Sequence, residues 1–92
     1  MDQTVSHAVT AATNVSSAKD LGHLIRDARE AMKLRQAEAA LLCGVGVRFL
    51  SDLENGKETA RLGQTLKVIN GLGLALTIGR KKPFWSEDGR RT

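Results

Sequence analysis

The 92-residue chain has room for one domain of ordinary size, and its formal net charge of +4 favours a polyanionic partner such as nucleic acid. Only two Phe and one Trp are present, so aliphatic side chains must build the core. A single cysteine excludes an intrachain disulfide, and no apolar run is long enough to cross a membrane. The N-terminus also lacks the features of a secretory signal. These features predict a soluble cytoplasmic protein.

The first predicted helix begins after residue 16. Residues 1–16 are nearly uncharged and without periodicity, which predicts a flexible tail. Ser17-Ala-Lys-Asp20 then has the pattern of a capping box, in which each side chain bonds a backbone N–H at the helix start. The apolar positions that follow recur at helical spacing and define one buried face, with Arg26, Arg29 and Lys33 off it: Leu21, Leu24, Ile25, Ala28 and Met32.

Two short helices follow. The Ala/Leu-rich run from about Gln36 to Cys43 predicts a helix that Gly44 ends, because glycine accepts the left-handed conformation found there. The next helix runs from about 47 to 54 and ends at Asn55-Gly56, two residue types that tolerate positive φ. Since so few residues join these two helices, they cannot be collinear.

A fourth helix is predicted over about residues 61–70. We expect Thr59 to cap it and Gly71 and Gly73 to end it. Its expected buried face consists of Leu62, Leu66 and Ile69.

The segment after these glycines alternates like a β-strand, with Leu74, Leu76 and Ile78 on one face. No second strand is evident, and a lone strand has two unpaired edges. Antiparallel pairing of two copies about a two-fold axis removes this problem, so we predict a homodimer. The last residues, 81–92, are expected to form an irregular tail. Its Phe84-Trp85 pair fits an ordinary tail and a partner contact equally well.

The stretch from Gln36 to Lys57 resembles the Cro/repressor-type (XRE-family) helix-turn-helix proteins. Gln36, Glu38, Gly44, Val45 and the run Leu53-Glu-Asn-Gly-Lys57 match the pattern of that family, and the resemblance covers about residues 20–73. It implies a mainly α fold of four to five helices over residues 17–73, followed by a dimerisation strand over 74–80. Three positions depart from the pattern. Arg35 and Gly46 stand where the family has Ser or Thr and so weaken two helix caps, and Ala39 stands where Leu is common.

In such a fold the third helix enters the major groove of double-stranded DNA. If Leu50 and Leu53 face the core, the outward positions become the candidate base contacts: Gly46, Val47, Arg48, Ser51 and Asp52. Arg48 is suited to guanine, whereas Asp52 either repels phosphate or accepts a hydrogen bond from cytosine. The candidate phosphate contacts are Arg35, Gln36, Asn55 and Lys57.

Within this family the chain is similar to HipB-like antitoxins, above all in Leu66-Lys-Val-Ile-Asn-Gly-Leu-Gly-Leu74. The resemblance implies a dimer that represses its own operon at a near-palindromic operator and restrains a HipA-type serine/threonine kinase toxin. Two alternatives remain open at this point, a stand-alone phage-type or metabolic repressor and a protein-interaction adaptor without specific DNA binding. His7, His23 and Cys43 lack metal-ligand spacing, and no catalytic constellation is recognisable. We therefore expect no cofactor, no metal and no enzymatic activity.

Overall fold

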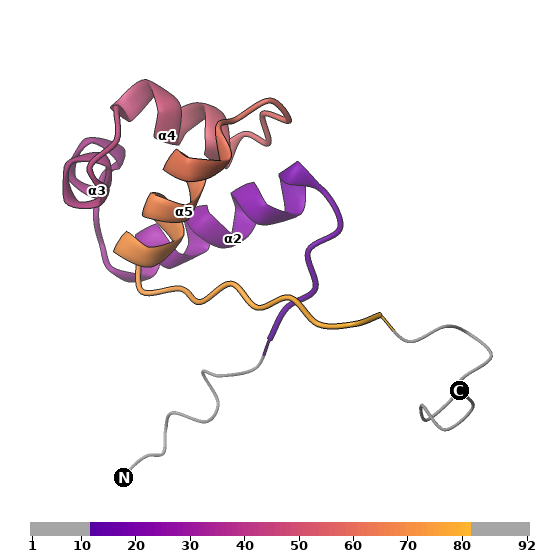
Figure 1. The fold of residues 1–92 in the computed structure, drawn as a ribbon. Helices are drawn as coiled ribbons and strands as arrows, with labels where there is room; N and C mark the ends of the chain where they lie inside the picture. Colours follow the sequence, from indigo (N-terminus) through magenta and orange to yellow (C-terminus); the bar gives the residue numbers. More distant parts are fainter. Residues whose placement is uncertain (1–11, 82–92) are drawn as a thin grey trace, which may run out of the picture.

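Residues 12–81 are described by a computed structural model of the chain, and they form a mainly helical helix-turn-helix fold (Figure 1). The helices are α2 (Ala18–Ala31), α3 (Gln36–Cys43), α4 (Val47–Glu54) and α5 (Leu62–Gly71). Helix α4 packs against both α2 and α3, and α3 also packs against α5. In this part of the chain no helix is both long and apolar enough to span a membrane.

Helix α2 begins where the capping pattern predicts, although one bond differs. The Ser17 hydroxyl accepts from the N–H of Asp20 at 3.1 Å. The Asp20 carboxylate, however, accepts from the N–H of Ser16 at 2.9 Å, one residue earlier than a capping box requires. At the other end, Met32 was expected on the buried face and is 46% exposed, because it is the C-cap residue, past the last full turn.

All four helices end in the same way. A residue of positive φ follows α3 directly and follows α2, α4 and α5 after one intervening cap residue. In each case the next N–H bonds a carbonyl five residues back, as in the Schellman motif. This places the predicted glycines Gly44, Gly56 and Gly73 at φ values of 75°, 85° and 77°. At the end of α2 the same role falls to Lys33, with a φ of 59°. At the end of α4 the positive φ belongs to Gly56, while Asn55, the cap residue before it, has a φ of −88°.

The core lies where α2, α3, α4 and α5 meet. Its buried apolar residues are Ile25, Ala39, Ala40, Cys43, Leu50, Leu53, Val68, Ile69 and Leu72. Two glycines allow close helix approach. A Cβ on Gly22 would lie 2.5 Å from the Leu53 carbonyl oxygen on α4, and a Cβ on Gly71 would lie 2.5 Å from the Cys43 Sγ on α3. The packing of α4 on α2, and of α5 on α3, therefore depends on these two positions.

The predicted start and buried face of the fourth helix were partly wrong. Arg61 is the N-cap of α5, so Thr59 lies two residues too early to cap it. Of the three residues predicted to be buried, Ile69 is 4% exposed but Leu62 is 69% exposed. Leu66 is also exposed, and the core-facing positions are instead filled by Thr65, Val68 and Ile69. The helix therefore presents leucines to solvent in the single chain.

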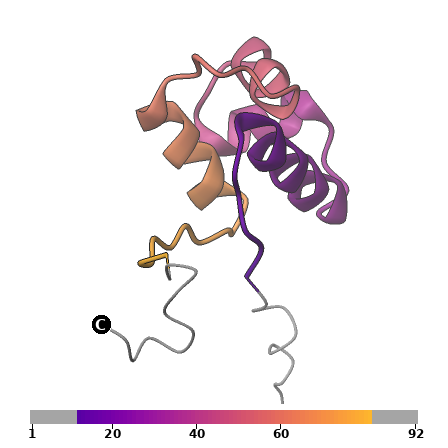
Figure 2. The same cartoon turned by 90° about the vertical axis from the view of Figure 1, so that its right-hand side faces the viewer.

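The segment after α5 is extended and leaves the helical body, as the two views show (Figure 1, Figure 2). Leu74 still packs against the core, whereas Leu76 and Ile78 are exposed. No strand is assigned to residues 74–80, because a strand is defined by hydrogen bonds to a neighbour and the described part of this single chain supplies none. Phe84 and Trp85 lie outside the described residues, as do residues 1–11 of the predicted tail.

Candidate nucleic-acid interface

The helix-turn-helix consists of α3, the turn at residues 44–46, and α4. The N–H of Val45 bonds the carbonyl of Ala40 at 3.0 Å, which closes the turn tightly. Both predicted cap weaknesses are present, since neither Arg35 nor Gly46 offers a side-chain cap. At Arg35 the loss is offset in part, because its N–H donates to the Glu38 carboxylate at 2.8 Å.

The predicted division of α4 into two faces is confirmed. Leu50 and Leu53 are 0% and 4% exposed and face the core. Gly46, Val47 and Arg48 are exposed, and Ser51 and Asp52 are half-buried. Arg48 is the one Lys or Arg residue of α4, and its side chain is 89% exposed. The first turn of α4 thus presents an apolar side chain, Val47, next to the guanidinium of Arg48.

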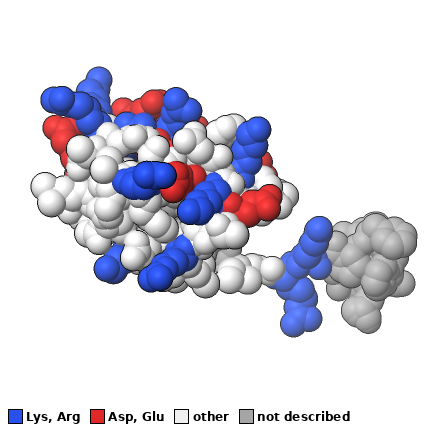
Figure 3. Space-filling model, turned by 90° about the horizontal axis from the view of Figure 1, so that it is seen from above, with Lys and Arg blue, Asp and Glu red and all other residues white. Residues whose placement is uncertain are grey.

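The charge of this region is mixed rather than uniformly positive. The Asp52 carboxylate lies 3.8 Å from the Arg48 Nε and 3.7 Å from the Lys57 Nζ, and it is 34% exposed. Viewed from above, Lys and Arg side chains alternate with Asp and Glu side chains over the surface (Figure 3). Asp52 is therefore partly neutralised by two neighbours, and this reduces the repulsion that its charge exerts on a phosphate.

The residues predicted to contact phosphate lie at the start of α3 and just after α4. Arg35 precedes α3 and its side chain is 86% exposed. Asn55 and Lys57 follow α4 and are also exposed. Gln36, the first residue of α3, is half-buried because its side-chain amide donates to the Glu54 carboxylate at 3.0 Å. The predicted dimerisation residues belong to the extended segment and take no part in this arrangement.

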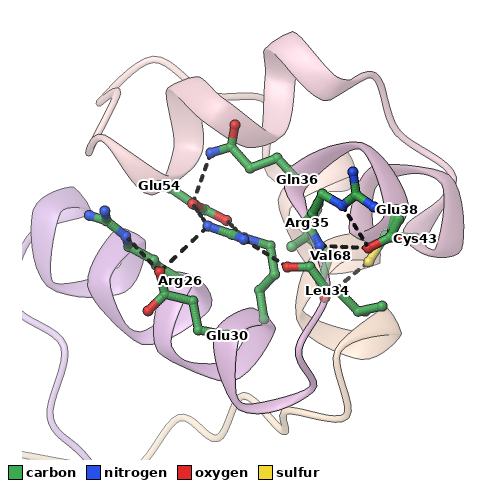
Figure 4. A network of polar contacts seen from close by, with 10 residues as sticks. Arg26, Glu30, Leu34, Arg35, Gln36, Glu38, Cys43, Glu54 and Val68 are labelled. Atoms are coloured by element: carbon green, nitrogen blue, oxygen red, sulfur yellow. Dashed lines mark hydrogen bonds and ion pairs between the residues drawn. The ribbon is translucent and has the colours of Figure 1, made fainter.

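A buried polar network joins α2, α3 and α4 behind the interface (Figure 4). Arg29 on α2 donates to both oxygens of Glu54, the last residue of α4, at 2.6 and 2.9 Å. It also donates to the carbonyl of Leu34, in the loop before α3, at 2.8 Å. One Glu54 oxygen, Oε1, accepts both from Arg29 and from the side-chain amide of Gln36. The Arg29 side chain is 11% exposed and that of Glu54 is 3% exposed.

The ion pair shifts the titration of both partners. Burial alone would raise the pKa of Glu54, but the hydrogen bonds from Arg29 and Gln36, with the charge of Arg29, outweigh burial and lower it below its usual range. The hydrogen bond to Glu54 likewise raises the pKa of Arg29. Both groups are therefore held in their charged forms at neutral pH.

This network was not predicted from the sequence, and the prediction that Arg29 lies off the buried face was wrong. Two signals point to it. Arg29 lies four residues after Ile25 and eight after Leu21, so the three share one helical face. Glu54 lies at a helix C-terminus, where the macrodipole disfavours an anion, so a compensating cation is expected nearby.

Cys43 is a core residue in this structure. Its thiol is buried and lies 3.8 Å from the carbonyl oxygen of Val68. Burial raises the pKa of the thiol, which opposes formation of a thiolate. Within residues 12–81, no group of three or more His, Cys, Asp or Glu side chains is placed to hold a metal ion.

The arrangement of α2 to α5 defines a helix-turn-helix protein, and a comparison of sequences agrees. The family model for the helix-turn-helix domain matches residues 20–77, so the chain belongs to this family. The chain is also 43% identical over 67 residues to an uncharacterised HTH-type transcriptional regulator, y4mF, of Sinorhizobium fredii (strain NBRC 101917 / NGR234). The match covers 73% of this chain and 88% of that protein.

Solved structures with the same fold include two complexes that contain HipB. One is a HipB-O4 20mer complex and the other a HipA-HipB-O2-O3 complex, each with a TM-score of 0.70 and 22% sequence identity. In both comparisons the match covers 77% of this chain and 100% of the solved chain. At this level of identity, the likeness establishes a shared fold.

Proposed function

We propose that this protein is a dimeric, sequence-specific DNA-binding repressor and the antitoxin of a HipBA-like operon. The observation that carries the DNA-binding part is the first turn of α4, where Val47 and Arg48 are exposed beside a tight turn while Leu50 and Leu53 anchor the helix in the core. A helix presented in this way fits the major groove of B-DNA, and its N-terminal side chains reach the base edges.

The proposed base contacts are Gly46, Val47, Arg48, Ser51 and Asp52. The Arg48 guanidinium suits the O6 and N7 atoms of guanine, and Val47 suits a thymine methyl group. At 3.8 Å from Arg48, the Asp52 carboxylate can orient the guanidinium or accept from the amino group of cytosine.

The proposed phosphate contacts are Arg35, Gln36, Asn55 and Lys57. They lie at the start of α3 and just after α4, and they combine two cations with two amides, which are common phosphate partners. These contacts fix the protein on the backbone without reading sequence.

The proposed dimer forms through the segment that carries Leu74, Leu76 and Ile78. Ile78 is 88% exposed and Leu76 is 52% exposed, on an extended backbone that has no strand partner in the described part of the chain. Antiparallel pairing with a second copy satisfies this backbone and covers both side chains. The two α4 helices then meet major grooves about 34 Å apart on a near-palindromic operator.

The proposed protein partner is a HipA-type serine/threonine kinase toxin. The fold likeness to HipB, including HipB in a complex with HipA, supports this partner. Phe84 and Trp85 remain the proposed partner-binding residues in the tail.

Fluorescence anisotropy with the duplex upstream of the gene tests the DNA-binding proposal. We expect Arg48→Ala to weaken binding by about 1–3 kcal/mol and to relax preference at one base pair in each half-site. Lys67→Ala is a matched control, because it removes one exposed positive charge from α5 and leaves α4 intact. An equal loss for Arg48→Ala on every duplex sequence would contradict base reading.

Co-purification from the native host, together with light scattering, tests the partners. We expect a dimer that elutes with a kinase-like protein, and a monomer or weakened dimer for Ile78→Asp. A dimer that binds operator without a kinase would instead favour a stand-alone repressor. Partner binding without any operator binding would favour the adaptor.

A further inference from the structure

The buried hydrogen bonds around Glu54 hold Gln36, the proposed phosphate contact at the start of α3. The carboxylate accepts from Gln36, a proposed phosphate contact, and from Arg29, which belongs to a different helix (Figure 4). Arg29 in turn holds the Leu34 carbonyl, two residues before Gln36. The N-terminus of α3 is thus fixed both through its side chain and through the backbone that leads into it.

We infer that Arg29 and Glu54 are positioning residues for DNA binding, which hold Gln36 and the start of α3 in the geometry that contacts a phosphate. This inference rests on the proposed DNA-binding function. Neither residue needs to touch DNA, because their side chains are 11% and 3% exposed.

The chemistry of the Gln36 amide supports this role. A side-chain amide nitrogen carries two hydrogens, and the contact with Glu54 uses one of them, so the second can still be donated to a phosphate. A carboxylate acceptor fixes the amide in one orientation and polarises it, since hydrogen bonds to ionised groups are shorter and stronger than neutral ones. Without Glu54, the side chain must be ordered when DNA binds, and this ordering costs affinity.

A double-mutant cycle between Gln36→Ala and Glu54→Gln separates positioning from simple stabilisation. The Glu54→Gln variant keeps the side-chain shape but leaves one oxygen for the three N–H groups that Arg29 and Gln36 donate. We expect it to weaken operator binding by about tenfold, the equivalent of about 1.4 kcal/mol. In the Gln36→Ala background the same change should alter affinity by less than about twofold, because the residue that Glu54 positions is already absent.

Val68→Ala is the matched control for lost stability. Val68 is fully buried on α5 and its side chain is apolar, so its truncation destabilises the core and removes none of the hydrogen bonds among Arg29, Gln36 and Glu54. All variants are assayed at a temperature below the unfolding transition of the least stable variant, and circular dichroism checks that each is folded. We expect Val68→Ala to bind operator like the wild type under these conditions.

Ethylation interference supplies a readout that stability alone does not move. We expect Gln36→Ala and Glu54→Gln to lose interference at the same phosphate, and Val68→Ala to retain it. Equal loss of affinity from Glu54→Gln in both backgrounds, with an unchanged interference pattern, would overturn the positioning role while leaving the proposed function intact. Failure of the wild type to bind any duplex would overturn both.

Discussion

Replacing Gly22 with alanine tests how closely α2 and α4 must approach. The added Cβ would lie 2.5 Å from the Leu53 carbonyl oxygen and 2.7 Å from that of Glu54. Both atoms belong to the backbone of α4, so neither can rotate away, and relief of the clash requires the helices to separate by up to about 1 Å. Overpacking of this kind costs about 1–3 kcal/mol, whereas the better helix propensity of alanine returns about 0.5–1 kcal/mol.

We therefore expect Gly22→Ala to lower the free energy of unfolding by about 1–2 kcal/mol. For a domain of this size, this corresponds to a fall in Tm of roughly 4–16 °C. Urea unfolding followed by circular dichroism gives the free energy, and a thermal melt gives the midpoint.

Gly63→Ala is the matched control, because it makes the same change in α5 where the added Cβ meets nothing within 4 Å. It should leave stability unchanged or raise it by up to about 1 kcal/mol. If Gly22→Ala were as stable as Gly63→Ala, the close contact between α2 and α4 would be refuted.

Two further predictions concern stability. Because the pKa of Glu54 is lowered in the folded state, its ion pair stabilises the protein above the unfolded pKa of about 4.3, and this contribution is lost as pH falls through the folded value. The stability advantage of wild type over Glu54→Gln, measured by urea unfolding, should shrink below about pH 5, and a gap that stays constant down to pH 3 would contradict this. Separately, Lys33→Gly should raise stability by about 1 kcal/mol, because Lys33 adopts a φ of 59° that costs little for glycine. A lower Tm for Lys33→Gly in a thermal melt would show that the left-handed conformation is not strained.

The helix bounds were largely predictable because the signals that set them are local. Helices α3 and α4 match their predicted ranges, since Gly44 and Gly56 provide the positive φ values at which they end. The start of α2 was predictable for the same reason, because the Ser17 cap bonds a backbone N–H only three residues away. The end of α2 lacked such a signal, because Lys33 adopts the left-handed conformation without being glycine.

What the sequence did not predict depends on contacts between distant residues. Arg29 and Glu54 are 25 residues apart, and charged residues are expected at the surface unless a partner is known. The buried face of α5 was misassigned because its leucines and its core residues both recur at helical spacing. In the single chain, packing against the shared core, which includes α3, decides that Val68 and Ile69 turn inward.

The buried network raises the question of why a small domain keeps an ion pair where apolar side chains fit. Replacing a buried pair with apolar residues is often neutral or stabilising, whereas removing one partner costs about 3–5 kcal/mol. We therefore expect Arg29→Met alone to be strongly destabilised, and the pair Arg29→Met with Glu54→Leu to recover most of the lost stability in urea unfolding. The double variant should nevertheless bind operator about as weakly as Gln36→Ala, since Gln36 has lost its acceptor. Wild-type affinity in this stable double variant would mean that the ion pair serves the fold alone.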